Sequence, residues 1–363
     1  MSYEKKNSIQ LSTKPDFEKC MDRIYAWYNN DIVDRVPVRF SAHNSEYNHV
    51  NQESRWGSLK DRWFDVEYQI SKFEKEIKNK EFLGETFPAY WPNLGPNVYP
   101  CMVGGEAEFG DVTTWAKHTL KSCDELDKVK FSKDNPYFKK LEQLTYAALE
   151  SCGDKYLVGY TDIHHGPDCA DALRGTQELC IDMYDDPDAV KSLILKCSDD
   201  FRFIFNHFNK ILKDHGQPSI TWINIPSFDS FHIPGADLAA MLSNESFKEF
   251  ILPSIQEEVK IAKHNVFHMD GKGVANHVDD ILRISEINAI QWVQGVGADE
   301  PIMQWFPLIK KIQNAGKGIV IDLKVNELET FINNVDPKGI YLCISSSEVH
   351  EQKGILNRLL KWK

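Results

Sequence analysis

The chain has 363 residues, of which 42% are hydrophobic and 12% aromatic, and its formal net charge is −12. A chain of this composition can bury a large core, and its length suits either two average domains or one α/β barrel. The acidic balance and the lack of a basic stripe argue against nucleic acid and against anionic membranes as partners.

Three further features predict a cytoplasmic protein. The first residues, Met-Ser-Tyr-Glu-Lys-Lys, lack the apolar region of a signal peptide. No apolar run approaches the roughly 20 residues that a membrane-spanning helix needs. The eight cysteines are scattered without a C-x-x-C pair, which indicates reduced thiols rather than a disulfide framework.

Apolar runs alternate with segments of helical periodicity along the chain. We predict strands at residues 36–41, 85–90, 156–161, 220–225, 265–269, 289–293, 318–321 and 339–344. We predict helices at 56–79, 135–152, 186–215, 244–263, 276–285, 300–315, 325–333 and 347–361.

This alternation indicates a parallel sheet, and eight such units predict an α/β fold with a single (β/α)8 TIM barrel. We expect an N-terminal helical extension at 1–33, the barrel at 34–363, and a long loop insertion around 91–118. An open doubly wound sheet is disfavoured, because Ser41-Ala42-His43-Asn44 is not a glycine-rich phosphate loop.

The residues that follow barrel strands build the active face of such a fold. At these positions we predict catalytic roles for His268, Asp270, Asp162 and His164. We predict substrate binding by His43, Asn44, Trp91, Asn93, Asn224, Gln291 and Trp292.

The most informative stretch is His268-Met269-Asp270-Gly271, at the end of a predicted strand. Side chains alternate along a strand, so His268 and Asp270 project to the same face. Such a pair can bind a metal, act as an acid and a base, hold a substrate, or simply order the loop.

Several segments resemble the uroporphyrinogen decarboxylase-like superfamily, which includes decarboxylases and cobalamin-dependent methyltransferases on one barrel. Asp34-Arg35-Val36-Pro37-Val38 looks like the opening strand of the family, and residues 238–253 (LAAMLSNESFKEFILP) resemble its helix motif. His268-Met269-Asp270-Gly271 and Gln291-Trp292 are similar to its later strands. The resemblance covers roughly residues 34–361.

The departures from the family pattern narrow the expectation. True decarboxylases carry an arginine-bearing F-R-Q-A-G-R segment where this chain reads Arg39-Phe40-Ser41-Ala42-His43-Asn44, so we expect a substrate other than uroporphyrinogen. The methyltransferase branch carries H-x-C-G and a late cysteine that hold zinc. In the matching places stand His268, Asp270 and Cys343, so the resemblance implies a zinc site of these three residues.

Two enzyme classes therefore remain. In the first, the protein is a methyltransferase component that moves a methyl group between a small-molecule substrate and a corrinoid supplied by a partner protein. In the second, it is a metal-free decarboxylase or lyase, in which Asp162 or Asp270 stabilises a cationic intermediate. A barrel that only binds a ligand is a third class. We expect a homodimer in either enzyme.

Overall fold

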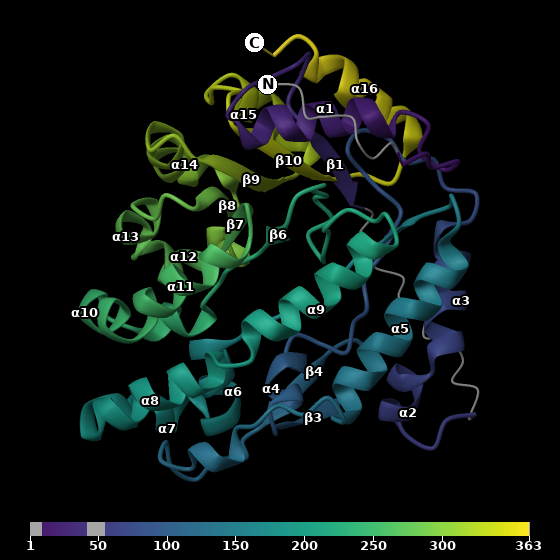
Figure 1. Cartoon of the computed structure of the whole chain (residues 1–363). Coiled ribbons are helices and arrows are strands. Elements are labelled where there is room, and N and C mark those ends of the chain that lie inside the picture. The colour runs from purple at the N-terminus through teal and green to yellow at the C-terminus, as the bar shows by residue number, and fades with distance from the viewer. Residues whose placement is uncertain (1–8, 42–54, 363) are drawn as a thin grey trace.

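A computed structural model describes residues 9–41 and 55–362 (Figure 1). Its strands are β1 Val38–Ser41, β2 Ala89–Tyr90, β3 Glu106–Phe109, β4 Thr114–Lys117, β5 Leu157–Val158, β6 Phe231–His232, β7 His264–Asp270, β8 Ile287–Val293, β9 Gly318–Leu323 and β10 Ile340–Ser345. Its α-helices are α1 Phe17–Tyr28, α2 Leu59–Phe64, α3 Val66–Ile77, α4 Val98–Met102, α5 Pro136–Cys152, α6 Gly166–Arg174, α7 Thr176–Asp185, α8 Pro187–Ser198, α9 Phe201–Asp214, α10 Asn244–Ser246, α11 Leu252–Glu258, α12 Gly271–Ala275, α13 Val278–Leu282, α14 Phe306–Asn314, α15 Leu328–Ile332 and α16 Val349–Leu359.

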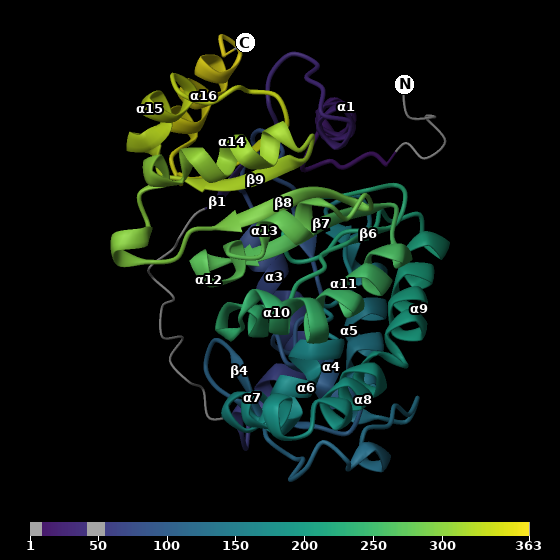
Figure 2. The same cartoon turned by 90° about the vertical axis from the view of Figure 1, so that its left-hand side faces the viewer.

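Six strands form a curled parallel sheet in the order β1-β10-β9-β8-β7-β6. Helices cover its outer face, as α14 does over β9 (Figure 2). Because the strands are parallel, their carboxyl ends meet at one edge, where Asp270 stands in register with Val293 and Ser41 with Ser345. The prediction of an α/β fold with a parallel sheet is therefore confirmed.

Main-chain hydrogen bonds continue from this sheet to the short pair β2 and β5. Glu85 N donates to Val38 O of β1, and Leu157 N donates to Pro88 O. Tyr160 N then donates to Ile220 O, beyond β5. The predicted strands at 85–90 and 156–161 thus exist in shortened form.

The predicted strand at 220–225 is wrong. Residues 221–224 form a tight turn that is closed by Asn224 N donating to Thr221 O, and Asn224 has a φ of +58°. The left-handed conformation suits asparagine better than a strand residue. On the side away from β8, the parallel partner of β7 is β6, which the sequence pattern did not predict.

The predicted long loop at 91–118 contains regular structure of its own. It includes α4 and the antiparallel pair β3 and β4, in which Glu106 opposes Lys117. Helices α6 and α7 were also not predicted. Elsewhere local caps agree with the sequence: Asn135 accepts from Tyr137 N and Phe138 N at the start of α5, with Pro136 in its first turn.

Helix α1 crosses the amino-terminal ends of the strands. Trp27 Nε1 donates to Gly339 O, just before β10, and Tyr28 stacks on His264, the first residue of β7, with ring centroids 3.9 Å apart. Met21, Ile24 and Trp27 pack with inward-facing residues such as Val266. The interior of the sheet is therefore filled at its amino-terminal end.

Among the described residues no helix has the length and apolar character to cross a membrane.

We expect Glu85→Gln to lower the free energy of unfolding by about 3–5 kcal/mol, because Glu85 is fully buried and neutralises Arg23 and Arg35. Urea denaturation of the full chain measures this. The control is Glu81→Gln, since Glu81 is half-exposed and pairs with the exposed Lys353. A Glu85→Gln midpoint as close to the parent value as that of Glu81→Gln would contradict the expectation.

Candidate functional site

A cavity of about 300 Å³ opens at the carboxyl edge of the sheet. Its lining comprises Trp63, Trp91, Asn93, Gly95, Pro96, Val112, Thr113, Asp162, His164, Trp222, Asp237 and His268. Five of these residues, Trp91, Asn93, Asp162, His164 and His268, were predicted as site residues from the sequence. Segments that are far apart in the chain thus meet where a barrel-type active face was expected.

Strand β7 orients the central histidine. His268 and Asp270 lie on the inner side, whereas Met269 between them is fully buried in the outer core. His268 Nδ1 donates to Gln291 Oε1 of the neighbouring strand β8 at 2.9 Å. Because an amide oxygen can only accept, Nδ1 carries a proton, and His268 Nε2 is the ring nitrogen that is turned toward Asp237.

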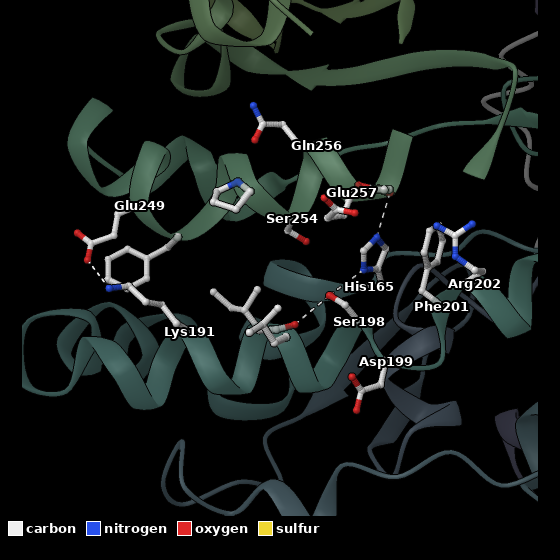
Figure 3. Close-up of a pocket in the computed structure, with 15 residues that line it drawn as sticks. His165, Lys191, Ser198, Asp199, Phe201, Arg202, Glu249, Ser254, Gln256 and Glu257 are labelled. Carbon is white, nitrogen blue, oxygen red and sulfur yellow. Dashed lines mark hydrogen bonds and ion pairs between the residues drawn. The ribbon is translucent and has the colours of Figure 1, made fainter. Parts of the chain in front are cut away.

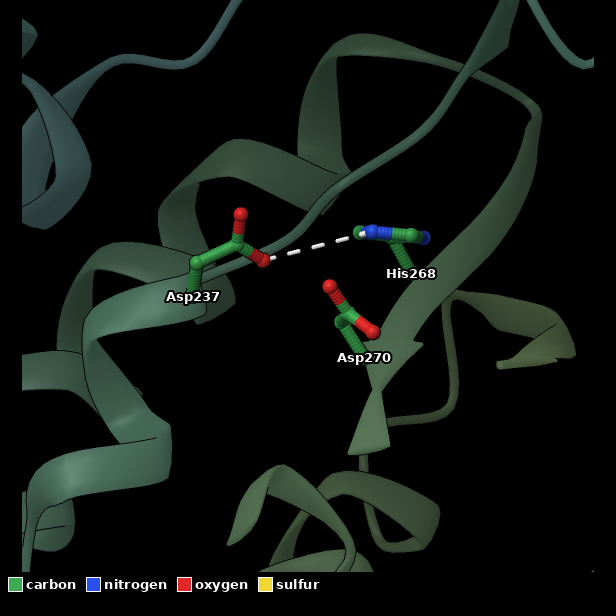
Figure 4. Close-up of side chains that lie close together, drawn as sticks. All are labelled: Asp237, His268 and Asp270. Atoms are coloured by element: carbon green, nitrogen blue, oxygen red, sulfur yellow. Dashed lines mark ion pairs between the residues drawn. The ribbon is translucent and has the colours of Figure 1, made fainter. Parts of the chain in front are cut away.

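Asp237 joins His268 and Asp270 in one polar group (Figure 4). One ligand atom from each residue lies within 4.8 Å of the other two, and His268 Nε2 lies 4.0 Å from Asp237 Oδ1. Asp237 was not predicted. It begins a 3-10 helix, η2 (Asp237–Met241), directly before the LAAML motif, and the bridge between Gly235 and His268 sets it beside β7.

His164 supplies a positive charge to the same cavity. Its Nε2 lies 2.9 Å from Asp162 Oδ2, and its Nδ1 lies 3.8 Å from Asp168 Oδ2. Burial alone lowers the pKa of His164, but Asp162, Asp168 and Asp237 outweigh it and raise the pKa to about 10. His164 is therefore an imidazolium at neutral pH, held by carboxylates.

The site as a whole remains acidic. Burial, and then the charge of Asp237, raise the pKa of Asp168 to about 6, which shows how closely the carboxylates are gathered. Among the described residues that line the cavity there is no Lys or Arg. Such a surface favours a cation or a partly positive group.

Several predicted site residues lie elsewhere. Trp292 is fully buried on the outer face of β8, where it packs edge-on against Trp305. Asn224 donates to Phe87 O from the turn below the cavity, and the neighbouring Trp222 lines the cavity in its place. Gln291 is not among the lining residues of the cavity, and its side chain accepts the hydrogen bond from His268 Nδ1. His43 and Asn44 fall outside the described residues.

Cys343 does not join the group of His268 and Asp270. It faces the buried interior, where Arg39 Nε donates to its Sγ at 2.8 Å. Burial raises the pKa of the Cys343 thiol to about 11, although Arg39 opposes the shift. In the described chain, the third residue beside His268 and Asp270 is Asp237 rather than Cys343.

Comparison with known proteins gives a likeness in structure alone. No protein-family model matches the sequence, and no curated protein sequence matches it. The structure is similar to that of a methyltransferase from Methanosarcina mazei, with a TM-score of 0.62 and 12% sequence identity, over 96% of this chain and 98% of the other. At this identity the likeness concerns the fold.

We expect Asp162→Asn to lower the pKa of His164 by at least about 2 units. The substitution removes one of the carboxylates that raise this pKa, while burial continues to lower it. The ¹³C shift of the imidazole as a function of pH, recorded by NMR, measures it. The raised pKa stabilises the folded state fully below about pH 6.5, and this contribution is lost as pH rises through about 10.

The loss of stability in Asp162→Asn should accordingly be largest near pH ~6 and shrink toward pH ~10. Asp214→Asn is the matched control, since Asp214 pairs with the exposed Lys210 on α9. A His164 that titrates identically in the parent chain and in Asp162→Asn would refute the assignment of its charge to this pair.

Proposed function

We propose that this protein is a methyltransferase component that moves a methyl group between a small substrate and a corrinoid carried by a partner protein. The observation that carries the proposal is the group of His268, Asp237 and Asp270, whose ligand atoms lie within 4.8 Å of one another at the carboxyl edge of the sheet. The fold shared over the whole chain with a protein named a methyltransferase supports it. We further infer that β2, β5 and the chain beyond complete a (β/α)8 barrel around the cavity.

The group of His268, Asp270 and Asp237 fits a divalent metal, with zinc as the first candidate. Zinc accepts imidazole nitrogen and carboxylate oxygen, and a catalytic site leaves one position open. A hydrogen-bond acceptor on the other ring nitrogen, as Gln291 is for His268 Nδ1, commonly fixes the tautomer of a ligating histidine. Ligand atoms around zinc are separated by ~3.4 Å, so small side-chain rotations would bring Asp237 and His268 together. When bound, the metal would lower the pKa of a thiol or hydroxyl group of the methyl acceptor.

The remaining residues of the cavity would position the substrate. Trp63, Trp91 and Trp222 provide aromatic walls that exclude water from the transferred methyl group. The His164 imidazolium, which also lines the cavity, can hold or return a proton. The corrinoid protein would dock over the open carboxyl edge, and a homodimer would use the outer helices.

The charged state of His164 favours one alternative. An imidazolium inside an acidic cavity can protonate a carbanion, as a metal-free decarboxylase of the same superfamily requires. The substrate would then differ from uroporphyrinogen, because Arg39 is held by Cys343 and by Ile223 O and is not available to bind carboxylates.

Zinc binding distinguishes the methyltransferase component from the metal-free lyase. We expect the purified chain to bind zinc, and His268→Ala and Asp237→Asn to weaken binding at least tenfold, because each removes a ligand. Cys343→Ser should bind zinc like the parent chain, since its thiol faces Arg39. Equilibrium dialysis with metal analysis by mass spectrometry measures all four proteins.

Loss of zinc in Cys343→Ser with retention in Asp237→Asn would restore the ligand set implied by the resemblance. The activity itself is tested with free methylcobalamin and a thiol, by the change in the corrinoid spectrum on demethylation. Demethylation that depends on His268 supports methyl transfer. A chain that neither binds zinc nor demethylates methylcobalamin would favour the lyase.

A further inference from the structure

A second pocket lies outside the sheet, in a groove of about 620 Å³ between helices (Figure 3). One wall is formed by α8 and the start of α9, and the other by α11 and the π-helix η3 (Phe247–Ile251). Its apolar lining consists of Ile194, Leu195, Phe201, Phe250 and Pro253. The groove is large enough for a small-molecule ligand, and it shares no lining residue with the cavity at the strand ends.

His165 lies at the floor of this groove with a fixed tautomer. Ser198 Oγ donates its proton to Ile194 O at 2.9 Å, so it must accept from His165 Nδ1, 3.2 Å away. His165 Nε2 is then a lone-pair acceptor. It is buried and has no hydrogen-bond partner, in a residue that is only 6% exposed. A buried acceptor of this kind is costly unless something donates to it.

Glu258 lies beside this acceptor without a cation. It is 5% exposed, and its Oε1 lies 3.6 Å from His165 Nε2 and 2.9 Å from His232 Nε2. Burial lowers the pKa of His165 to about 4 and that of His232 to about 3, so both rings are neutral. Within the described chain only these histidines pair with Glu258. Among the described residues no cation therefore contacts its carboxyl group, although the charge of His164 acts on it from a longer distance.

Ser254 adds a third acceptor from the opposite wall. Its Oγ is buried and has no partner, and a Cβ at Gly166, next to His165, would lie 2.5 Å from it. Figure 3 shows Ser254 on α11, above His165 and Ser198. Three polar atoms thus surround the apolar end of the groove: a neutral nitrogen, a carboxyl oxygen and a hydroxyl oxygen.

We propose that this groove binds a primary ammonium group attached to an apolar body, such as an alkylamine or arylalkylamine. An ammonium group has three N–H donors, which match His165 Nε2, Glu258 Oε1 and Ser254 Oγ. Its charge would pair directly with the buried carboxyl group of Glu258. A neutral alcohol offers one donor, and a carboxylate would be repelled. The apolar body would lie along Ile194 and Phe250.

The charged residues at the rim of the groove would not select an ammonium group in the way that the buried acceptors do. Lys191 is paired with Glu249 at 2.6 Å, and the exposed Glu257 is paired with Lys260. Arg202 and Asp199 also line the groove toward solvent, where Asp199 pairs with Lys196. Exposed charges such as these contribute little to binding.

The test is isothermal titration calorimetry of the full chain with hexylamine, hexanol and hexanoate at pH ~8, where hexylamine is protonated as lysine is. We expect hexylamine to bind at least tenfold more tightly than hexanol, and hexanoate not to bind. Glu258→Gln should weaken hexylamine binding about a hundredfold, because it removes the buried charge. Glu257→Gln, which removes the same charge at the rim, should leave binding unchanged.

Ser254→Val keeps the test decisive if Glu258→Gln fails to fold. It removes a hydroxyl that has no partner, so it should fold normally and weaken hexylamine about tenfold. Burial raises the pKa of Glu258 to about 7, so hexylamine should bind more weakly at pH ~5.5 than at pH ~8. His165 and His232 contact Glu258, and His164 acts on it through its charge; none of the three changes its charge between pH ~5.5 and pH ~8.

The outcomes divide cleanly. Selective binding of hexylamine that depends on Glu258 and Ser254 supports the proposal. Absence of hexylamine binding, equal binding of hexanol, or binding that survives both Ser254→Val and Glu258→Gln overturns it. None of these readouts depends on methyl transfer, so they stand apart from the test of the proposed function.

Discussion

The carboxylate of Glu85 accepts hydrogen bonds from Arg23 of α1, from Arg35 ahead of β1, and from the main-chain nitrogen of Val38. Its main-chain oxygen accepts from Tyr341 of β10. One buried residue thus connects the N-terminal helix, two neighbouring strands and the segment before β2. Because an unpaired charge at this depth would be strongly unfavourable, these elements must assemble together. This constraint accounts for the filled amino-terminal end of the sheet. The polar side chains of the site lie at the opposite, carboxyl end.

Strand alternation made the centre of the site predictable. His268 and Asp270 were placed on one face from spacing alone, and the structure puts Met269 on the other, in the outer core. The same rule should have separated Gln291 from Trp292. They are adjacent on β8, so only Gln291 can face His268 while Trp292 packs outward. The error lay in assigning both to the site because both follow the same apolar run.

Other parts of the site depend on contacts that no local pattern records. The run ITWINI at 220–225 is apolar and β-branched, which favours a strand, yet Asn224 adopts a left-handed turn and donates to Phe87 O, far away in the chain. Asp237 lies in a segment without strand or helix periodicity, and only the bridge from Gly235 to β7 brings it to His268. Arg39 holds Cys343 across the β1–β10 register, which residue spacing cannot reveal.

His164 and His165 are adjacent in the chain but belong to two different sites, the cavity at the strand ends and the groove between the helices. His164 faces carboxylates in the cavity, which raise its pKa to about 10 against the effect of burial. The next residue faces the groove outside the sheet, where burial lowers the pKa of His165 to about 4. Adjacent imidazoles therefore carry different protonation states at neutral pH, because one peptide unit directly before α6 separates two environments. The backbone between these two residues couples the groove to the cavity. Ser198 holds the His165 ring toward the groove, and in this arrangement the His164 ring is turned toward Asp162.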